Sequence, residues 1–286
     1  MVLSAARTTA KKLFTVIEGS AEVSRAWQRA LRDRAVSPTY YLGPLVKRAA
    51  GVGDPPVNST PRKVVYSRGS MRLYHFEPAV RRHRTPILFV YSLINRYYIL
   101  DFLPKRSLIE YMTEQGFDVY AIDWGTPGPV EQDMTWDDMT GGLIQAAVRW
   151  TLKVSGADDL TLYGYCMGGT MALAYAALYP QKVRNFVAQA TPVDFSEGGI
   201  FTTWTDPGHF DVDAMVDAYG NVPIDLMESG FSMMAPVQRI SKWFEVFRRL
   251  DDKDFVTTFL AMETWAADNV PFPGEVYRQY IKDCYQ

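Results

Sequence analysis

The sequence predicts a protein of the α/β class, with a mostly parallel sheet and a helical segment after it. Short β-type runs alternate with helical runs between residues 87 and 190, and this order requires a parallel sheet with right-handed crossovers. After residue 196 the runs are helical and no clear strand follows. With 286 residues, 48% of them hydrophobic, the chain suits one large domain or one domain with an inserted cap.

The expected elements follow the hydrophobic periodicity along the chain. Apolar residues at helical spacing predict an amphipathic helix over 10–33, and Gly and Pro predict a linker over 51–61. Two β-rich runs, 64–66 and 71–76, predict a hairpin. The other expected elements are strands at 87–91, 117–122, 160–163 and 186–190, helices at 105–115, 135–153 and 171–178, and later helices at 213–219, 237–250, 255–267 and 275–285. We therefore expect a basic helical arm with a linker at 1–60, an α/β core at 61–196 and a helical cap at 197–286.

Composition and charge narrow the class of protein. Two cysteines do not make a disulfide framework, and without a secretory leader we expect a reducing, cytoplasmic location. No stretch approaches the roughly 20 apolar residues of a membrane span. Residues 1–50 hold nine Lys/Arg against three Asp/Glu, in a chain of net charge −2. We favour a solvated helix face for this basic arm, although an anionic surface, a partner protein or nucleic acid remains an alternative.

The sequence G-x-C-x-G at 164–168 predicts a nucleophile elbow, a tight turn that lifts a reactive side chain above the sheet. Cys166 stands where most such enzymes carry Ser. A Cβ at Gly164 or Gly168 would collide with the neighbouring strand or helix. The turn also places the sulfur at a helix N-terminus, whose partial positive charge favours the thiolate. The alternative is a small buried cysteine in a chance match.

Loops that follow parallel strands meet at one edge of the sheet, where the functional site belongs. We expect the loops 92–101 and 124–134 to gather there with the elbow. Asp101 and Asp123 are expected to orient these loops by accepting backbone N–H bonds, and neither is predicted to be catalytic. Neither a metal-ligand cluster nor a phosphate-cradling Gly-rich loop is recognisable in the sequence.

Six blocks of sequence resemble the polyhydroxyalkanoate synthases. They occur in the family's order and cover the chain from about residue 61 to 286: LINRYYILD (93–101), VYAIDWG (119–125), GYCMGGT (164–170), ATPVDF (190–195), YGNVP (219–223) and PFPGEVYRQYIKD (271–283). The short arm before the first strand is similar to the catalytic subunit of the two-subunit synthases. The resemblance implies an α/β-hydrolase fold with a helical cap.

The resemblance also implies acyl transfer from a 3-hydroxyacyl-CoA to a growing polyester, with release of CoA. A thioester that passes its acyl group to a cysteine forms another thioester, so the acyl-enzyme stays reactive toward the hydroxyl of the next unit. CoA enters as part of the substrate, and no separate cofactor is implied. Trp124 and Trp265 are expected to line the acyl tunnel, or else to pack as ordinary aromatic residues.

An oxyanion hole and a general base complete this chemistry. The residue after the nucleophile supplies one N–H, here Met167, and we nominate Ile94 for the second. The order nucleophile, acid, histidine permits Cys166, Asp194 and His209, but no strand precedes His209 to fix its position. We favour an acid and base in a further C-terminal segment and missing final strands, so that residues 1–286 alone make no polymer. His75 and His83 precede the elbow and are expected to be structural.

Two other functions are compatible with the same nucleophile elbow. One is a hydrolase of the thioesterase or esterase type that uses a cysteine nucleophile, and the other is a non-catalytic synthase fragment that acts as a binding module. The synthase interpretation implies a second subunit and a polyester granule surface as partners, with a homodimer possible and no nucleic acid bound. The expected location is then the cytoplasm, at the granules.

Overall fold

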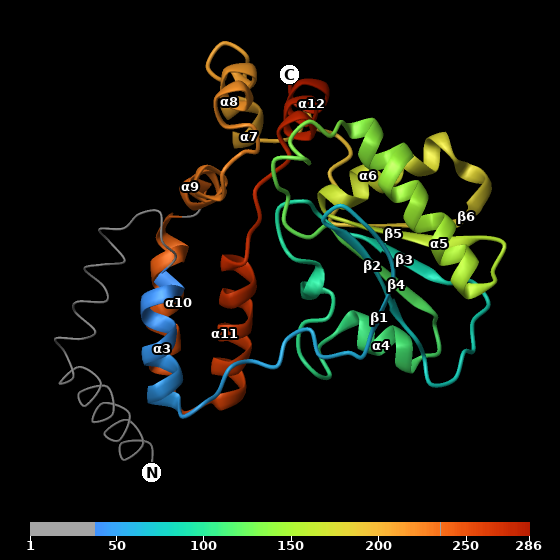
Figure 1. Ribbon diagram of the computed structural model, residues 1–286. Coiled ribbons are helices and arrows are strands. Elements are labelled where there is room, and N and C mark those ends of the chain that lie inside the picture. The colour runs from blue at the N-terminus through green and yellow to red at the C-terminus, as the bar shows by residue number, and fades with distance from the viewer. Residues whose placement is uncertain (1–37, 235) are drawn as a thin grey trace. The chain divides into compact units, whose positions relative to one another are not determined.

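The computed structural model describes residues 38–286 except 235, and these residues fall into two compact units. The larger unit comprises Val57–Ile224 and Asn269–Gln286. The smaller unit combines the described residues from Pro38 to Pro56 with Asp225–Asp268. Figure 1 shows the sheet within the larger unit and labels α3, α9, α10 and α11 in the smaller one.

A six-stranded sheet with the order β1-β2-β4-β3-β5-β6 forms the centre of the larger unit. β3, β4, β5 and β6 run parallel, and the β1–β2 hairpin adds to β4 antiparallel. The predicted hairpin and parallel sheet are therefore confirmed. The strands are β1 (Lys63–Arg68), β2 (Met71–Phe76), β3 (Ile87–Val90), β4 (Val119–Asp123), β5 (Leu160–Tyr165) and β6 (Val183–Gln189).

Burial explains why the central runs are continuously apolar. All four residues of β3 are buried, as are the first four residues of β4, because helices cover a parallel sheet on both faces. The connecting elements are η1 (Tyr97–Ile99), α4 (Leu108–Glu114), η2 (Asp138–Ile144), α5 (Gln145–Ser155), α6 (Met167–Leu178) and η3 (Pro180–Lys182). The predicted helix over 135–153 is present, but η2 is a π-helical turn at its start. It contains Gly141 and Gly142, two weak α-helix formers.

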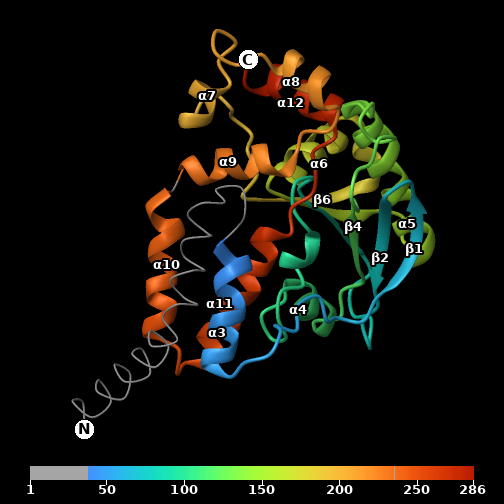
Figure 2. The same cartoon turned by 60° about the vertical axis from the view of Figure 1, so that its left-hand side comes forward.

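Three described helices of the larger unit follow β6: α7 (Ile200–Trp204), α8 (Val212–Tyr219) and α12 (Gly274–Cys284). Figures 1 and 2 both show α8 beside α12. Arg278 of α12 bonds to Asp213 and Asp217 of α8, and Lys282 bonds to Asp213 at 2.6 Å. These ion pairs hold the last helix of the chain against α8.

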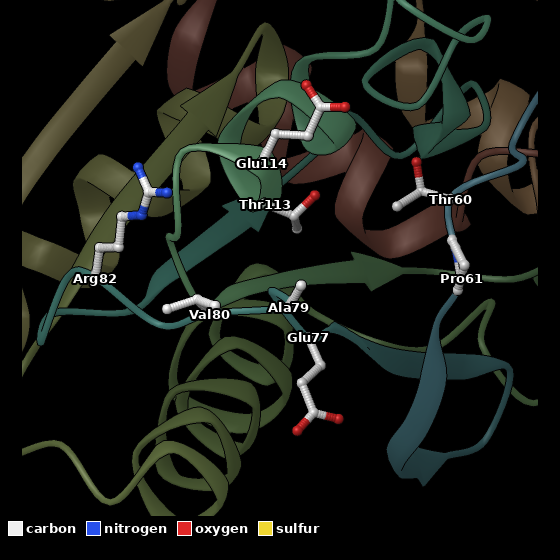
Figure 3. Close-up of a pocket in the computed structure, with 8 residues that line it drawn as sticks. All are labelled: Thr60, Pro61, Glu77, Ala79, Val80, Arg82, Thr113 and Glu114. Atoms are coloured by element: carbon white, nitrogen blue, oxygen red, sulfur yellow. The ribbon is translucent and has the colours of Figure 1, made fainter.

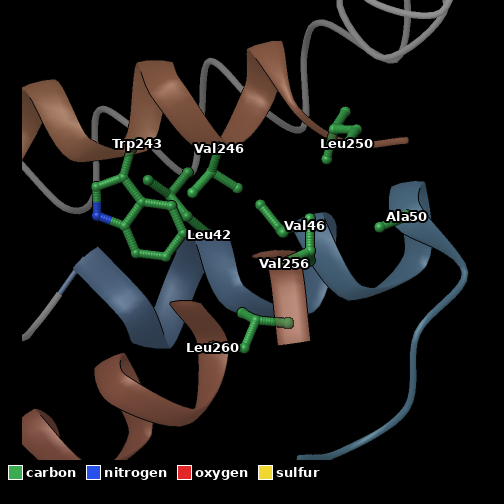
Figure 4. Packing of buried hydrophobic residues seen from close by; sticks show 8 residues of the cluster. All are labelled: Leu42, Val46, Ala50, Trp243, Val246, Leu250, Val256 and Leu260. Carbon is green, nitrogen blue, oxygen red and sulfur yellow. The ribbon is translucent and has the colours of Figure 1, made fainter. Parts of the chain in front are cut away.

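The smaller unit has its own apolar core, drawn in Figure 4. Its helices are α3 (Pro38–Ala50), α9 (Ile224–Met234), α10 (Pro236–Arg248) and α11 (Lys253–Ala267). Leu42, Val46 and Ala50 recur every four residues on α3, so one face of that helix is apolar and packs on Trp243 of α10 and Val256 of α11.

This packing differs from the expected division into arm, core and cap. α3 joins 225–268 instead of forming a separate arm, because its apolar face requires a partner. The expected cap at 197–286 is divided, since 197–224 and 269–286 belong with the sheet. The helix expected over 10–33 lies outside the described residues. No helix among residues 38–286, leaving out 235, is long and apolar enough to cross a membrane.

Candidate active site

Cys166 occupies the turn between β5 and α6, in a backbone conformation that side chains rarely adopt. Its φ is 54° and its ψ is −135°, which is unfavourable for any residue with a Cβ. Two backbone bonds hold the turn: the N–H of Cys166 donates to Gln189 O at 2.9 Å, and the N–H of Gly169 donates to Cys166 O at 2.8 Å. The strain is therefore borne by β6 and by the first turn of α6, and the elbow predicted from the sequence is present.

Glycines allow the elbow to lie this close to its neighbours. A Cβ at Gly164 would come within 2.3 Å of Gly169 Cα, and a Cβ at Gly168 within 2.4 Å of the Tyr91 carbonyl carbon. These are the collisions with helix and strand that the sequence predicts. A third glycine was not singled out from the sequence: a Cβ at Gly169 would come within 1.9 Å of Thr191 Oγ1.

The two thiols differ in their surroundings. Cys166 is half-buried and stands at the N-cap of α6, a helix of 12 residues, where backbone N–H groups favour an anion. Cys284 is half-buried on α12, where burial and, to a smaller extent, the charge of Asp283 raise the pKa of its thiol to about 11. The turn thus favours reactivity at Cys166, and burial disfavours it at Cys284.

The loops after the parallel strands gather at the elbow as expected. Trp124 Nε1 donates to Tyr91 O at 2.8 Å, and Arg96 Nη1 donates to Gly125 O at 3.0 Å. The loop after β3 therefore contacts both the elbow and the loop after β4. Ile94 lies in that loop, and its carbonyl accepts the N–H of Val270 at 3.1 Å. The oxyanion roles of Ile94 and of Met167, the first residue of α6, stay predictions.

Both aspartates that were expected to orient loops do so. Asp101 is buried and accepts the N–H of Thr60 at 3.1 Å and the hydroxyl of Ser107 at 2.8 Å. Asp123 Oδ1 accepts the N–H of Gly125 at 2.9 Å. Two tryptophans were expected to line the acyl tunnel. Trp124 is buried where the loops meet at the elbow, whereas Trp265 lies on α11 in the smaller unit.

Among the described residues, no hydrogen bond links Asp194, His209 and Cys166 into a catalytic triad. Asp194 is exposed, and its Oδ1 accepts the N–H and hydroxyl of Ser196 at 3.0 and 2.6 Å, a bonding that lowers the pKa of its carboxyl. His209 is exposed before α8, where its N–H donates to Asp206 O. The geometry therefore gives no support to the triad that the chain order permits.

The other two histidines, His75 and His83, lie near the start of β4, at the end of the sheet away from the elbow. His75 pairs across the ladder with Tyr120 near the start of β4, stacks on its ring and bonds to Asp118 at 2.6 Å. His83 stacks on Phe117, just before the same strand. Both are structural, as expected from the sequence. The pocket of Figure 3, of about 280 Å³, is lined by Glu77 and other residues at this end and is not part of the elbow.

An aromatic cluster next to the elbow was not anticipated from the sequence. Tyr280 of α12 stacks on Trp136 with the centroids 5.7 Å apart, and Phe195 meets Tyr280 and Tyr285 edge-on at 5.7 and 4.9 Å. Aromatic and charged residues alternate along 275–285, and this pattern could have indicated the cluster. The same pattern is equally typical of ordinary helix packing. In residues 38–234 and 236–286, no group of His, Cys, Asp or Glu is arranged to hold a metal ion.

Comparisons with known proteins agree with this geometry. The α/β hydrolase fold model matches residues 85–223, and the model described as Poly-beta-hydroxybutyrate polymerase (PhaC) N-terminus matches residues 45–112. The chain is 40% identical over 267 residues to the poly(3-hydroxyalkanoate) polymerase subunit PhaC of Haloferax mediterranei, which covers 92% of this chain and 53% of that protein. It is 38% identical over 232 residues to the subunit of the same name from Allochromatium vinosum, covering 79% of this chain and 65% of the relative.

The chain thus spans between about half and two thirds of the length of these relatives. A solved α/β hydrolase enzyme from the metagenome of lagoon sediments at Mar Chica, Morocco, matches 52% of this chain and 59% of its own, with 18% identity and a TM-score of 0.33. The strand order, the elbow and the family models establish the α/β-hydrolase fold. Together with the relatives, they show that most of the chain is similar to the poly(3-hydroxyalkanoate) polymerases.

Proposed function

We propose that this protein polymerises 3-hydroxyacyl-CoA into a polyester through an acyl group carried on Cys166. The single observation that supports this most is the cysteine at the strained turn between β5 and α6. The relatives are named poly(3-hydroxyalkanoate) polymerase subunits, which favours an acyltransferase over a hydrolase with the same elbow.

In the first step the Cys166 thiolate attacks the thioester carbonyl, and the C–S bond to CoA breaks, so CoA leaves as a thiolate. The tetrahedral oxygen carries a negative charge in between. The N–H groups of Met167 and Ile94 are proposed to receive it, one at the start of α6 and one in the loop after β3. Because a thioester replaces a thioester, the acyl-enzyme retains the reactivity of the donor.

In the second step the hydroxyl of another acyl unit attacks the acyl-enzyme, an ester forms and the sulfur leaves. This step requires a base to take the hydroxyl proton. Through residues 38–286, apart from 235, no hydrogen bond joins Cys166 to a histidine, so we assign the base to none of the three. Asp194 and His209 remain the pair that the chain order permits.

We also propose partners and a location. The relatives carry the word subunit in their names, which supports assembly with a second synthase subunit. Growth of an insoluble polyester on the enzyme would hold it at a granule surface in the cytoplasm.

The test is product analysis with 3-hydroxybutyryl-CoA. In the whole protein with its proposed second subunit, the proposal predicts release of CoA together with polyester chains, and loss of both in Cys166→Ala. Residues 1–286 alone are expected to give no polymer. A hydrolase would release CoA and free 3-hydroxybutyrate in equal amounts without polymer. A binding module would release no CoA above the Cys166→Ala background.

A further inference from the structure

The loop that follows β6 is hydrogen-bonded to both ends of the nucleophile turn. At the start of the turn, the N–H of Cys166 donates to the carbonyl of Gln189, the last residue of β6, at 2.9 Å. At its end, Thr170 in the first turn of α6 donates its side-chain hydroxyl to the carbonyl of Pro192 at 2.8 Å. The strand side and the helix side of the turn are therefore tied to one loop, and all of these residues belong to the larger unit.

This loop is stiff, because three consecutive residues have a restricted backbone. Ala190 has a φ of 48°, in the left-handed region that few residues with a Cβ adopt. Thr191 precedes a proline, which disfavours the helical region for it, and the ring of Pro192 fixes its own φ. Thr191 also packs on α6, since a Cβ at Gly169 would lie only 1.9 Å from its Oγ1. A displacement of the loop therefore displaces the first turn of α6.

The turn needs such support because Cys166 is itself strained. Its φ of 54° and ψ of −135° are unfavourable for a residue with a Cβ, and such a conformation persists only where surrounding contacts over-determine it. β6 is the last strand in the sheet order and pairs with β5, so among the described residues the sheet supports the loop through one neighbouring strand. The helix α6 adds support through Gly169 and Thr170.

The hydroxyl of Thr170 is the side-chain group that makes this link. A threonine in a helix can donate its hydroxyl to the carbonyl four residues earlier, which here belongs to Cys166. A hydroxyl has one proton to donate, and in this structure it goes to Pro192 of the loop instead. The bond therefore joins two elements and leaves the carbonyl of Cys166 to the N–H of Gly169, at 2.8 Å.

We propose that Thr170 is a positioning residue for the nucleophile: its bond to Pro192 holds the loop after β6 on α6 and fixes the sulfur of Cys166 relative to the N–H of Met167. The inference rests on the proposed role of Cys166 as the acyl carrier. Thr170 acts through the backbone of the turn and exchanges no proton with the substrate. Without the bond the turn relaxes, and the tetrahedral oxygen formed on attack no longer meets its donors at the best distance.

The test compares two reactions of Cys166 in the whole protein with its proposed second subunit. Acylation by 3-hydroxybutyryl-CoA, followed as CoA released in the first turnover, passes through a tetrahedral oxyanion and depends on the donors around it. Alkylation by iodoacetamide displaces iodide from a CH₂ group and forms no oxyanion, so it reports the exposure and ionisation of the thiol. A positioning role affects the first reaction and spares the second.

Thr170→Val removes the hydroxyl and keeps the shape of the side chain. The acylation rate at saturating substrate should fall about tenfold, with the half-saturating concentration and the alkylation rate unchanged, because a misplacement of about 1 Å costs up to about 100-fold. Thr170→Ser retains a hydroxyl and should retain the rate. Thr113→Val is the matched control, since Thr113 on α4 donates its hydroxyl to Glu110 O at the same distance of 2.8 Å and lines the pocket away from the elbow. Both of its rates should equal those of the unmodified protein.

Several outcomes would overturn the proposal: acylation at the unmodified rate in Thr170→Val, an equal fall of acylation and alkylation, the same fall in Thr113→Val, or a loss in Thr170→Ser as large as in Thr170→Val. If valine prevents folding, Thr170→Ala takes its place, because alanine favours the helix and also lacks the hydroxyl. The proposed function fails separately: no acylation of Cys166 in the unmodified protein refutes both proposals, whereas equal acylation of the unmodified protein and Thr170→Val refutes the role of Thr170 alone.

Discussion

Gly164 and Gly169 lie so close that a Cβ on the first would come within 2.3 Å of the Cα of the second. Gly164 is in β5 and Gly169 is in the first turn of α6, so this contact sets how tightly the strand meets the helix. The sharp turn at Cys166 exists because both positions lack a side chain.

A methyl group at Gly164 should therefore disrupt the turn. We expect Gly164→Ala to lower the free energy of unfolding by at least about 2 kcal/mol, because the neighbour is backbone and cannot rotate away. Urea unfolding followed by circular dichroism measures this. Gly230→Ala in α9 is the control: nothing lies within 4 Å of its Cβ, so stability should stay the same or rise by about 0.5–1 kcal/mol. Equal effects of the two substitutions would count against the account.

The two cysteines should react at very different rates. Burial holds the pKa of Cys284 at about 11, so its reactive thiolate is scarce at pH 8 and grows about tenfold with each pH unit up to that value. Iodoacetamide at pH 8 should therefore label Cys166 first, as peptide mapping can show. In urea both should react alike. Faster labelling of Cys284 in the folded protein would contradict this.

The ion pairs between α8 and α12 should depend on pH. Bonds from Lys282 and Arg278 lower the pKa of the Asp213 carboxyl, so their stabilising effect is present above the unfolded pKa of Asp and is lost as the pH falls through the lower folded value. Arg278→Met should destabilise the protein at pH 7 and have little effect at pH 2. Thermal unfolding at both pH values checks this, and an equal loss at the two would argue for packing instead of charge.

Segments of the expected cap should open more readily than the elbow elements. β5 is bonded to strands on both sides, whereas α7 has five residues and no buried ones. Hydrogen exchange should therefore be faster over residues 197–235 than over 159–190. Equal protection of the two regions would remove the case for a mobile cover that admits CoA.

The sequence was most informative where one chemical pattern determines one structure. The apolar runs of β3 and β4 and the glycines around Cys166 permit few alternatives, so the sheet and the elbow were predictable. α3 was not predicted, because its apolar face at Leu42 and Val46 is buried by packing against Trp243, which lies about 200 residues later in the sequence. The place of Tyr280 next to the elbow depends in the same way on contacts between distant segments, which no local periodicity contains.

The central claim is that Cys166 accepts the acyl group, and mapping the acyl-enzyme tests it most directly. The protein is mixed with 3-hydroxybutyryl-CoA labelled in the acyl group, quenched in acid, digested and analysed by mass spectrometry. We expect the label on the peptide that contains Cys166, one CoA released for the first acyl group bound, and no label in Cys166→Ala. Label on Cys284, or release of CoA at an undiminished rate in Cys166→Ala, would contradict the account.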